Sequence, residues 1–223
     1  MKIKGAIFDM DGTLVDSLMF WDHLWRQIGL RYMGNEQFKP DQEIDKKVRT
    51  MIYTDAMAYF KDYYKLPGET DEFIRFASDG VTDFYKQVAK IKPGAIALLE
   101  YLKSQNIKLC LASATAMEWI RVSLQSCGLS AYFDTVLSCA DMGVGKDRPD
   151  IYLKAMRLLG LPAGEICVFE DSFVALETAK RAGFQTVGVF DRYNFGQERL
   201  KAAADLYLNE RQTLDALIAT IHA

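Results

Sequence analysis

Two aspartates separated by one residue follow a short apolar run near the N-terminus. The run Gly5-Ala6-Ile7-Phe8 leads directly into Asp9-Met10-Asp11-Gly12-Thr13-Leu14. Because strand side chains alternate with a period of two, Asp9 and Asp11 would point the same way at a strand end. Crowded carboxylates raise each other's pKa unless a divalent cation or a phosphoryl group compensates them. The pair therefore predicts such a site, and the alternative is an acidic turn in which Gly12 only supplies a positive φ.

Polar residues also stand where three later segments stop. The apolar run 107–112 ends in Ser113-Ala114-Thr115, and the run 166–169 ends in Glu170-Asp171-Ser172. Between them, the segment beyond the run 135–138 leads to Lys146. If these runs are strands of one parallel sheet, their ends meet at one edge. A hydroxyl, a cation and an acidic pair would then join Asp9 and Asp11.

This set of groups suits phosphoryl transfer, in which catalysis is mostly positioning and charge neutralisation. A carboxylate can attack phosphorus and form an aspartyl-phosphate, which splits one difficult displacement into two. We expect Asp9 to be the nucleophile. We expect Asp11 to protonate the leaving oxygen and then to take a proton from the hydrolytic water.

The acidic residues predict a Mg²⁺ site. Mg²⁺ prefers near-octahedral oxygen ligation and keeps several waters, so it needs few protein ligands. We expect these to be the Asp9 carboxylate, the backbone carbonyl of Asp11 and the Asp171 carboxylate, with Glu170 joining directly or through water. The alternative for Glu170 and Asp171 is an acidic cap on a helix that begins near Phe173.

Three residues are candidates for binding the phosphate oxygens. The hydroxyl of Ser113 and the backbone N–H of Ala114 can donate hydrogen bonds, and Lys146 supplies a positive charge. Each has an ordinary structural alternative: Ser113 could cap the following helix, and Lys146 could be a solvated loop residue.

The pattern along the chain predicts the elements that would position these groups. Strand-like runs at residues 5–9, 107–112, 135–138, 166–169 and 186–190 alternate with helix-like stretches after residue 90. We predict an α/β fold with a doubly wound, mostly parallel, Rossmann-like sheet, whose ligands bind beyond the carboxyl ends of the strands. A short sixth strand at 205–208 and a terminal helix over 214–223 complete it.

Residues 17–88 interrupt this pattern with aromatic and charged residues at helical spacing. We predict a helical cap domain over 17–88, inserted into an α/β core formed by 1–16 and 89–223. Trp21, Leu24, Trp25 and Ile28 recur at i, i+3, i+4 and i+7, which is typical of core packing.

Composition excludes several classes of partner. The chain has 223 residues, a net charge of −3 and no block of like charge, so neither nucleic acid nor a membrane is an expected partner. No segment has the pattern of a signal peptide or a membrane span. Four cysteines lie in apolar segments without metal-ligand spacing, which indicates free thiols in the cytoplasm. A small phosphorylated metabolite is the expected partner, and the oligomeric state is left open.

These motifs resemble the haloacid dehalogenase-like phosphohydrolase superfamily. Its pattern is Asp-x-Asp-Gly-Thr after the first strand, then a Ser or Thr, a Lys and an acidic pair after the next three. The helical insert and the segment Gly145-Lys146-Asp147-Arg148-Pro149-Asp150-Ile151-Tyr152 resemble its β-phosphoglucomutase and phosphoglycolate phosphatase branch. The resemblance implies that Asp9 is phosphorylated, that Asp11 is the acid/base, that Ser113 and Lys146 bind phosphate, and that Asp171 and Glu170 bind Mg²⁺. The second aspartate argues against dehalogenase activity.

The favoured function is a Mg²⁺-dependent phosphatase, and two alternatives remain. One is a phosphomutase, an isomerase that returns the phosphoryl group to another hydroxyl. Many sugar-phosphate members, including the mutases, carry a histidine where this chain has Trp21. His23 lies two residues later, about 200° from Trp21 around a helix, so it would not take the place of that histidine. The other alternative is a non-enzymatic phospho-acceptor module, a class that usually lacks an insert of this kind.

Overall fold

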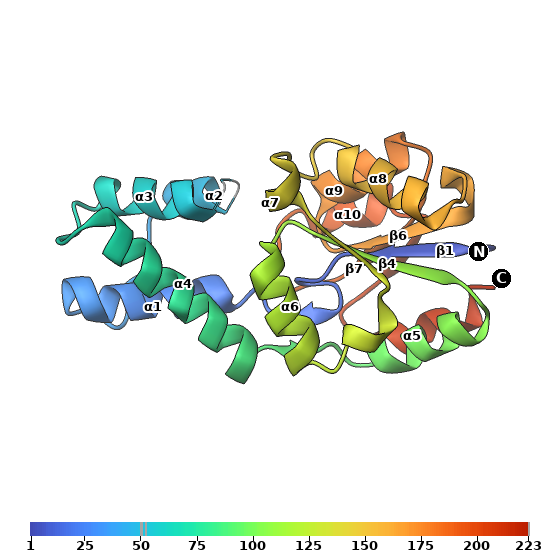
Figure 1. The fold of residues 1–223 in the computed structure, drawn as a ribbon, viewed down its shortest axis with the longest axis horizontal. Coiled ribbons are helices and arrows are strands. Elements are labelled where there is room, and N and C mark those ends of the chain that lie inside the picture. Colours follow the sequence, from blue (N-terminus) through green and yellow to red (C-terminus); the bar gives the residue numbers. More distant parts are fainter. Residues whose placement is uncertain (50, 52, 223) are drawn as a thin grey trace. The chain divides into compact units, whose positions relative to one another are not determined.

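The apolar runs predicted as strands form one parallel sheet. The computed structural model describes residues 1–49, 51 and 53–222. Within them the sheet has six strands in the order β5-β4-β1-β6-β7-β8, and each neighbouring pair is parallel (Figure 1). The strands are β1 (Gly5–Phe8), β4 (Lys108–Ser113), β5 (Thr135–Ser138), β6 (Ile166–Glu170), β7 (Gln185–Val189) and β8 (Leu206–Leu208). The predicted doubly wound α/β core is confirmed, including its sixth strand.

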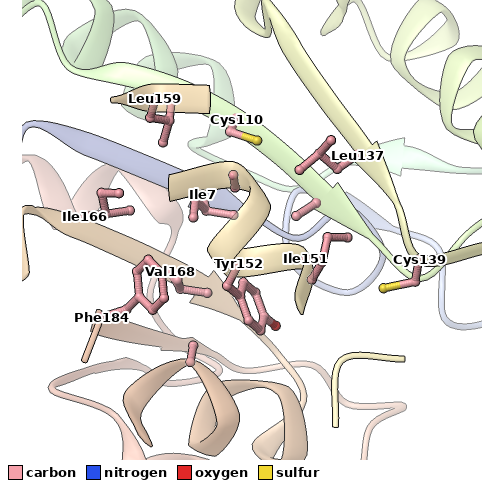
Figure 2. Packing of buried hydrophobic residues seen from close by; sticks show 13 residues of the cluster. Ile7, Cys110, Leu137, Cys139, Ile151, Tyr152, Leu159, Ile166, Val168 and Phe184 are labelled. Carbon is pink, nitrogen blue, oxygen red and sulfur yellow. The ribbon is translucent and has the colours of Figure 1, made fainter. Parts of the chain in front are cut away.

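Helices cover both faces of this sheet (Figure 1). One face carries α7 (Cys139–Met142), α8 (Asp150–Leu159), α9 (Phe173–Arg181) and α10 (Gln197–Ala203), and the other carries α5 (Ala95–Ser104) and α6 (Met117–Ser126). Figure 2 shows Tyr152 and Ile151 of α8 packed with Ile7 and Val168 of the sheet. Because both faces are buried, the strands need apolar residues throughout, which explains their continuous hydrophobic runs.

The chain folds into two compact units. One unit comprises Met1–Leu18 and Ala89–Ala223 and contains the sheet, and the other comprises Met19–Val88. The two segments of the first unit also pair through a small antiparallel ribbon, formed by β2 (Val15–Asp16) and β3 (Lys90–Ile91).

The second unit is helical throughout its regular elements. These are α1 (Phe20–Ile28), a π-helical turn (Gly29–Met33), α2 (Gln42–Val48), α3 (Tyr53–Tyr63) and α4 (Thr70–Gln87). Leu24, Trp25 and Ile28 are buried as predicted, and the Trp25 ring stacks on Phe60 with centroids 4.5 Å apart. Trp21 is only half-buried; its ring packs against Trp25, and the Arg49 guanidinium lies 5.4 Å from its centroid.

The prediction of a terminal helix over 214–223 is wrong. A short 3₁₀ helix spans Leu214–Ala219, and Ala223 lies outside the described residues. After this turn, the His222 carbonyl accepts a hydrogen bond from the Ile3 N–H at 2.9 Å. His222 thus pairs in parallel with the N-terminal segment at Lys2, which a helix over these residues would prevent. None of the helices described here combines the length and apolar character that crossing a membrane requires.

Candidate active site

The carboxyl ends of β1, β4 and β6 bring the predicted residues to one edge of the sheet. Phe8 is in register with Leu111 of β4 and with Phe169 of β6. Asp9, the residue after β1, therefore lies beside Glu170, the last residue of β6. Asp9 is 7 % exposed and Glu170 is 1 % exposed, so this is a buried pair of carboxyl groups.

Lys146 supplies one positive charge to this pair. Its Nζ lies 2.5 Å from Asp9 Oδ1 and 2.5 Å from Glu170 Oε1, and its side chain is 9 % exposed. The alternative in which Lys146 is a solvated loop residue is therefore wrong. The hydroxyl of Tyr152, a fully buried residue of α8, also donates to Glu170 Oε1 at 2.8 Å.

Burial and charge oppose each other in this group. Burial raises the pKa of Asp9 well above its usual value, Lys146 lowers it, and the neighbouring carboxylates, Glu170 foremost, raise it again. Burial alone would lower the pKa of Lys146, but Asp9 and Glu170 outweigh burial and raise it. These two carboxylates therefore favour the charged form of the lysine.

Asp171 faces the same edge rather than capping the next helix. Its Oδ2 accepts a hydrogen bond from Asn194 Nδ2 at 2.7 Å, and its Oδ1 lies 3.5 Å from Thr13 Oγ1. The residue at the start of α9, Ser172, makes no side-chain capping hydrogen bond. Gly12 has φ +78°, and a Cβ there would collide with the Asp171 carboxylate. Glycine in the Asp-x-Asp-Gly motif is thus required both by backbone conformation and by this close approach.

The carboxylates fit a divalent cation. One oxygen each from Asp9, Glu170 and Asp171 lies within 4.8 Å of the others, and all three residues are buried. Buried carboxylates need compensation by opposite charge, and oxygen donors of this kind suit Mg²⁺. Among the described residues, this group contains Asp9, Glu170 and Asp171, and a metal contact from the Asp11 backbone carbonyl stays a prediction.

The Asp11 carboxylate is held by two hydroxyl groups. Ser17 Oγ donates to one of its oxygens at 2.6 Å, and Thr115 Oγ1 donates to the other at 2.7 Å. Thr115 is placed by its neighbours: its N–H donates to Ser113 Oγ at 3.1 Å, and its carbonyl accepts from Ser138 Oγ at 2.7 Å. Asp11 is thus oriented at the sheet edge by residues that follow β2 and β4, supported by the last residue of β5.

The structure also places the remaining phosphate-binding candidates. Ser113 is the last residue of β4, is buried, and forms a turn with Thr115 instead of capping α6, which starts at Met117. Ala114 is the exposed residue between Ser113 and Thr115. Their binding of phosphate stays a prediction.

Sequence reasoning missed the supporting roles of four residues in this site. Tyr152, Thr115, Ser17 and Asn194 hold Glu170, Asp11 and Asp171 through their side chains. Thr115 stands in the Ser113-Ala114-Thr115 segment, and Tyr152 stands at the end of the segment around Lys146, so their positions were visible without their contacts. For Ser17 and Asn194, no motif in the chain pointed to the site.

We expect the metal-free protein to lose stability as pH rises between 3.8 and about 7. Burial, reinforced by Glu170, raises the pKa of Asp171 from 3.8 to about 7. In this interval the folded protein binds more protons than the unfolded chain, so the free energy of unfolding falls with increasing pH. Urea unfolding in EDTA at several pH values would measure this decline. Asp171→Asn should flatten it, and an unchanged slope in that variant would contradict the assignment.

Comparison with known proteins gives consistent matches over most of the chain. A family model described as haloacid dehalogenase-like hydrolase matches residues 3–183. A phosphorylated carbohydrates phosphatase from Thermotoga maritima is 26 % identical over 217 residues, covering 96 % of this chain and 98 % of the relative. The β-phosphoglucomutase of Bacillus subtilis is 26 % identical over 231 residues, covering 99 % and 94 %. The crystal structure of CbbY from Rhodobacter sphaeroides in complex with phosphate shares the fold, with a TM-score of 0.78, 24 % identity and 96 % coverage of both chains.

Proposed function

This chain belongs to the haloacid dehalogenase-like hydrolases, and we propose that it hydrolyses a small phosphate monoester through an aspartyl-phosphate on Asp9. The observation that carries the proposal is the buried contact of Asp9 with Lys146, 2.5 Å apart, inside a cluster of carboxylates. This arrangement pairs a nucleophile with a cation that can hold the oxygens of the attacked phosphoryl group.

In the first step, a carboxylate oxygen of Asp9 forms a bond to phosphorus while the bond from phosphorus to the ester oxygen breaks. Asp11 gives a proton to the departing oxygen, so the alcohol leaves neutral. Asp11 then accepts a proton from water as that water attacks the phosphorus of the aspartyl-phosphate. This second step releases inorganic phosphate and restores the Asp9 carboxylate.

The other groups bind and neutralise the phosphoryl oxygens. Lys146 contributes a positive charge, and Ser113 Oγ and the Ala114 N–H contribute hydrogen bonds. Asp9, Asp171 and Glu170, with the carbonyl of Asp11, would hold Mg²⁺, which when bound neutralises negative charge on the phosphoryl group.

We assign the helical insert, predicted over 17–88 and bounded by the compact unit Met19–Val88, as the cap domain of this family; Ser17 belongs to the core. Excluding bulk water protects an acyl-phosphate from premature hydrolysis, and movable elements commonly provide this exclusion. The relative named a phosphorylated carbohydrates phosphatase supports a small phosphorylated carbohydrate as the substrate class.

The test is phosphate release from a panel of small phosphate monoesters, with Mg²⁺ and with EDTA. The panel should include hexose, pentose and polyol phosphates, phosphoglycolate and nucleoside monophosphates. We expect release that requires Mg²⁺ and favours sugar or polyol phosphates. Equal release with EDTA would contradict the metal site, and no release from any ester would contradict the phosphatase assignment.

A phosphomutase is the second candidate, favoured by the similarity to a β-phosphoglucomutase along nearly the whole chain. A mutase needs a cation for a second phosphate, and Arg49 on the half-buried ring of Trp21 is a candidate in the second unit. Incubation with hexose 1-phosphates, Mg²⁺ and a bisphosphate primer separates the two functions. An isomeric sugar phosphate as product would establish the mutase, and free phosphate alone would support the phosphatase.

A further inference from the structure

The loop after β7 reaches the same sheet edge as the acidic cluster. β7 is the neighbour of β6, with Gly188 in register with Glu170, so the residues that follow β7 lie beside Asp171. We propose that Asn194, in this loop, is a positioning residue that holds the Asp171 carboxylate for a divalent cation. The inference rests on the proposed metal site and adds to it a residue that is not itself a ligand.

Asn194 makes two hydrogen bonds to one residue. Its Nδ2 donates to Asp171 Oδ2 at 2.7 Å and to the Asp171 backbone carbonyl at 3.2 Å. The other end of the amide is also engaged, because the Phe195 N–H donates to Asn194 Oδ1 at 2.9 Å. This last bond orients the NH₂ group toward Asp171, so the amide cannot turn its oxygen to the carboxylate without losing a partner.

The chemistry of an amide suits this position. Asp171 is 3 % exposed, so little water is available to orient its carboxylate. A neutral NH₂ group fixes Oδ2 without adding a positive charge that would repel a cation. The contact of Oδ1 with Thr13 Oγ1 is longer, at 3.5 Å. Partners of this kind, which orient ligands from outside the coordination sphere, typically change metal affinity by about 10- to 100-fold.

The loop that carries Asn194 is itself anchored to the core. Asp191 Oδ2 forms an ion pair with Lys92 Nζ at 2.8 Å, with side chains only 2 % and 12 % exposed. The Asp191 side chain also accepts a hydrogen bond from the Tyr193 N–H at 2.8 Å. Gln197 Nε2 donates to the carbonyl of Asp191 at 3.0 Å and to that of Asn194 at 3.3 Å. Asn194 is therefore held in place before any cation binds, as a positioning residue must be.

The experiment is Mn²⁺ binding to the full chain, freed of phosphate and metal, followed by electron paramagnetic resonance of free Mn²⁺. We expect Asn194→Ala to raise the Mn²⁺ dissociation constant about tenfold. In steady-state assays, the Mg²⁺ concentration for half-maximal activity should rise by a similar factor, while KM for substrate at saturating Mg²⁺ stays unchanged. Asn194→Ser, which keeps a small polar side chain but is too short to reach Asp171, should behave like Asn194→Ala and replaces it if the latter folds poorly.

Asn209→Ala is the matched control. Asn209 also lies in a loop after a strand, and its Oδ1 accepts a hydrogen bond from the Arg211 N–H at 2.9 Å, but its side chain is not bonded to Asp171. We expect this variant to bind Mn²⁺ like the wild type. Unchanged Mn²⁺ affinity in both Asn194 variants, or an equal loss in Asn209→Ala, would overturn the role of Asn194.

The outcome also separates this inference from the proposed function. Asp171→Asn tests the metal site directly, because it removes the ligand and not its support. If the wild type binds Mn²⁺ and Asp171→Asn does not, the metal site stands whatever Asn194→Ala does. If the wild type fails to bind Mn²⁺, the metal site is wrong, and the role of Asn194 is overturned with it.

Discussion

Replacing Asp9 by asparagine is expected to abolish turnover. The amide is a poor nucleophile and cannot form the aspartyl-phosphate, so both chemical steps are lost. We expect kcat to fall by at least roughly 10⁴-fold, as is found when the nucleophile of a covalent mechanism is removed. Phosphate release in Mg²⁺ from the best substrate of the panel measures the loss, and acid-quenched protein should carry no phosphate.

Two controls distinguish this result from misfolding. Asp134→Asn makes the same change at an exposed position before β5 and should retain full activity. Thermal unfolding should show that Asp9→Asn still folds, because Lys146 keeps its contact with Glu170. Ordinary Mg²⁺-dependent activity in Asp9→Asn would show that the covalent mechanism is wrong.

Asp11→Asn is expected to give the second largest loss, and one that depends on the leaving group. An amide at this position can still accept hydrogen bonds from Ser17 or Thr115, but it cannot pass a proton to the departing oxygen or take one from water. General acid–base catalysis contributes about 10²- to 10⁴-fold, so we expect kcat to fall within that range for an alkyl phosphate. Departure of the p-nitrophenolate anion, which needs no proton, should be affected far less in the first turnover.

The phosphorylated protein itself provides the decisive measurement. With p-nitrophenyl phosphate, Asp11→Asn should give slow phosphorylation of Asp9, followed by still slower hydrolysis. Asp16→Asn, in the adjacent β2 strand, is the matched control: the Asp16 side chain lies at the surface, 3.9 Å from the Arg192 guanidinium. An Asp11→Asn variant that matches Asp16→Asn on alkyl phosphates would refute the acid/base role.

The sequence alone predicted the sheet and the residues at its edge because both leave local signals. A strand buried on both faces must be apolar along its length, as Ile166–Glu170 is until its last residue. Parallel strands end together at one edge of the sheet. The polar residues that end such runs, including Asp9 and Glu170, are therefore expected to lie together at that edge. The helical character of residues 17–88 was visible for the same reason, since helical spacing is a property of a short stretch of chain. Their action as a cap stays a prediction.

The environment of each site residue was decided only by the tertiary structure. Taken alone, Lys146 in its sequence context is more typical of a solvated loop residue, and only the fold places it between Asp9 and Glu170. The contacts of Thr115 with Asp11 and of Asn194 with Asp171 join residues 104 and 23 positions apart. Such pairs depend on strand order, register and loop conformation, which no short stretch of sequence encodes. Local sequence thus determined which chemical groups reach the sheet edge, whereas long-range packing determined which of them touch, because hydrogen bonds form only between atoms that the whole fold brings together.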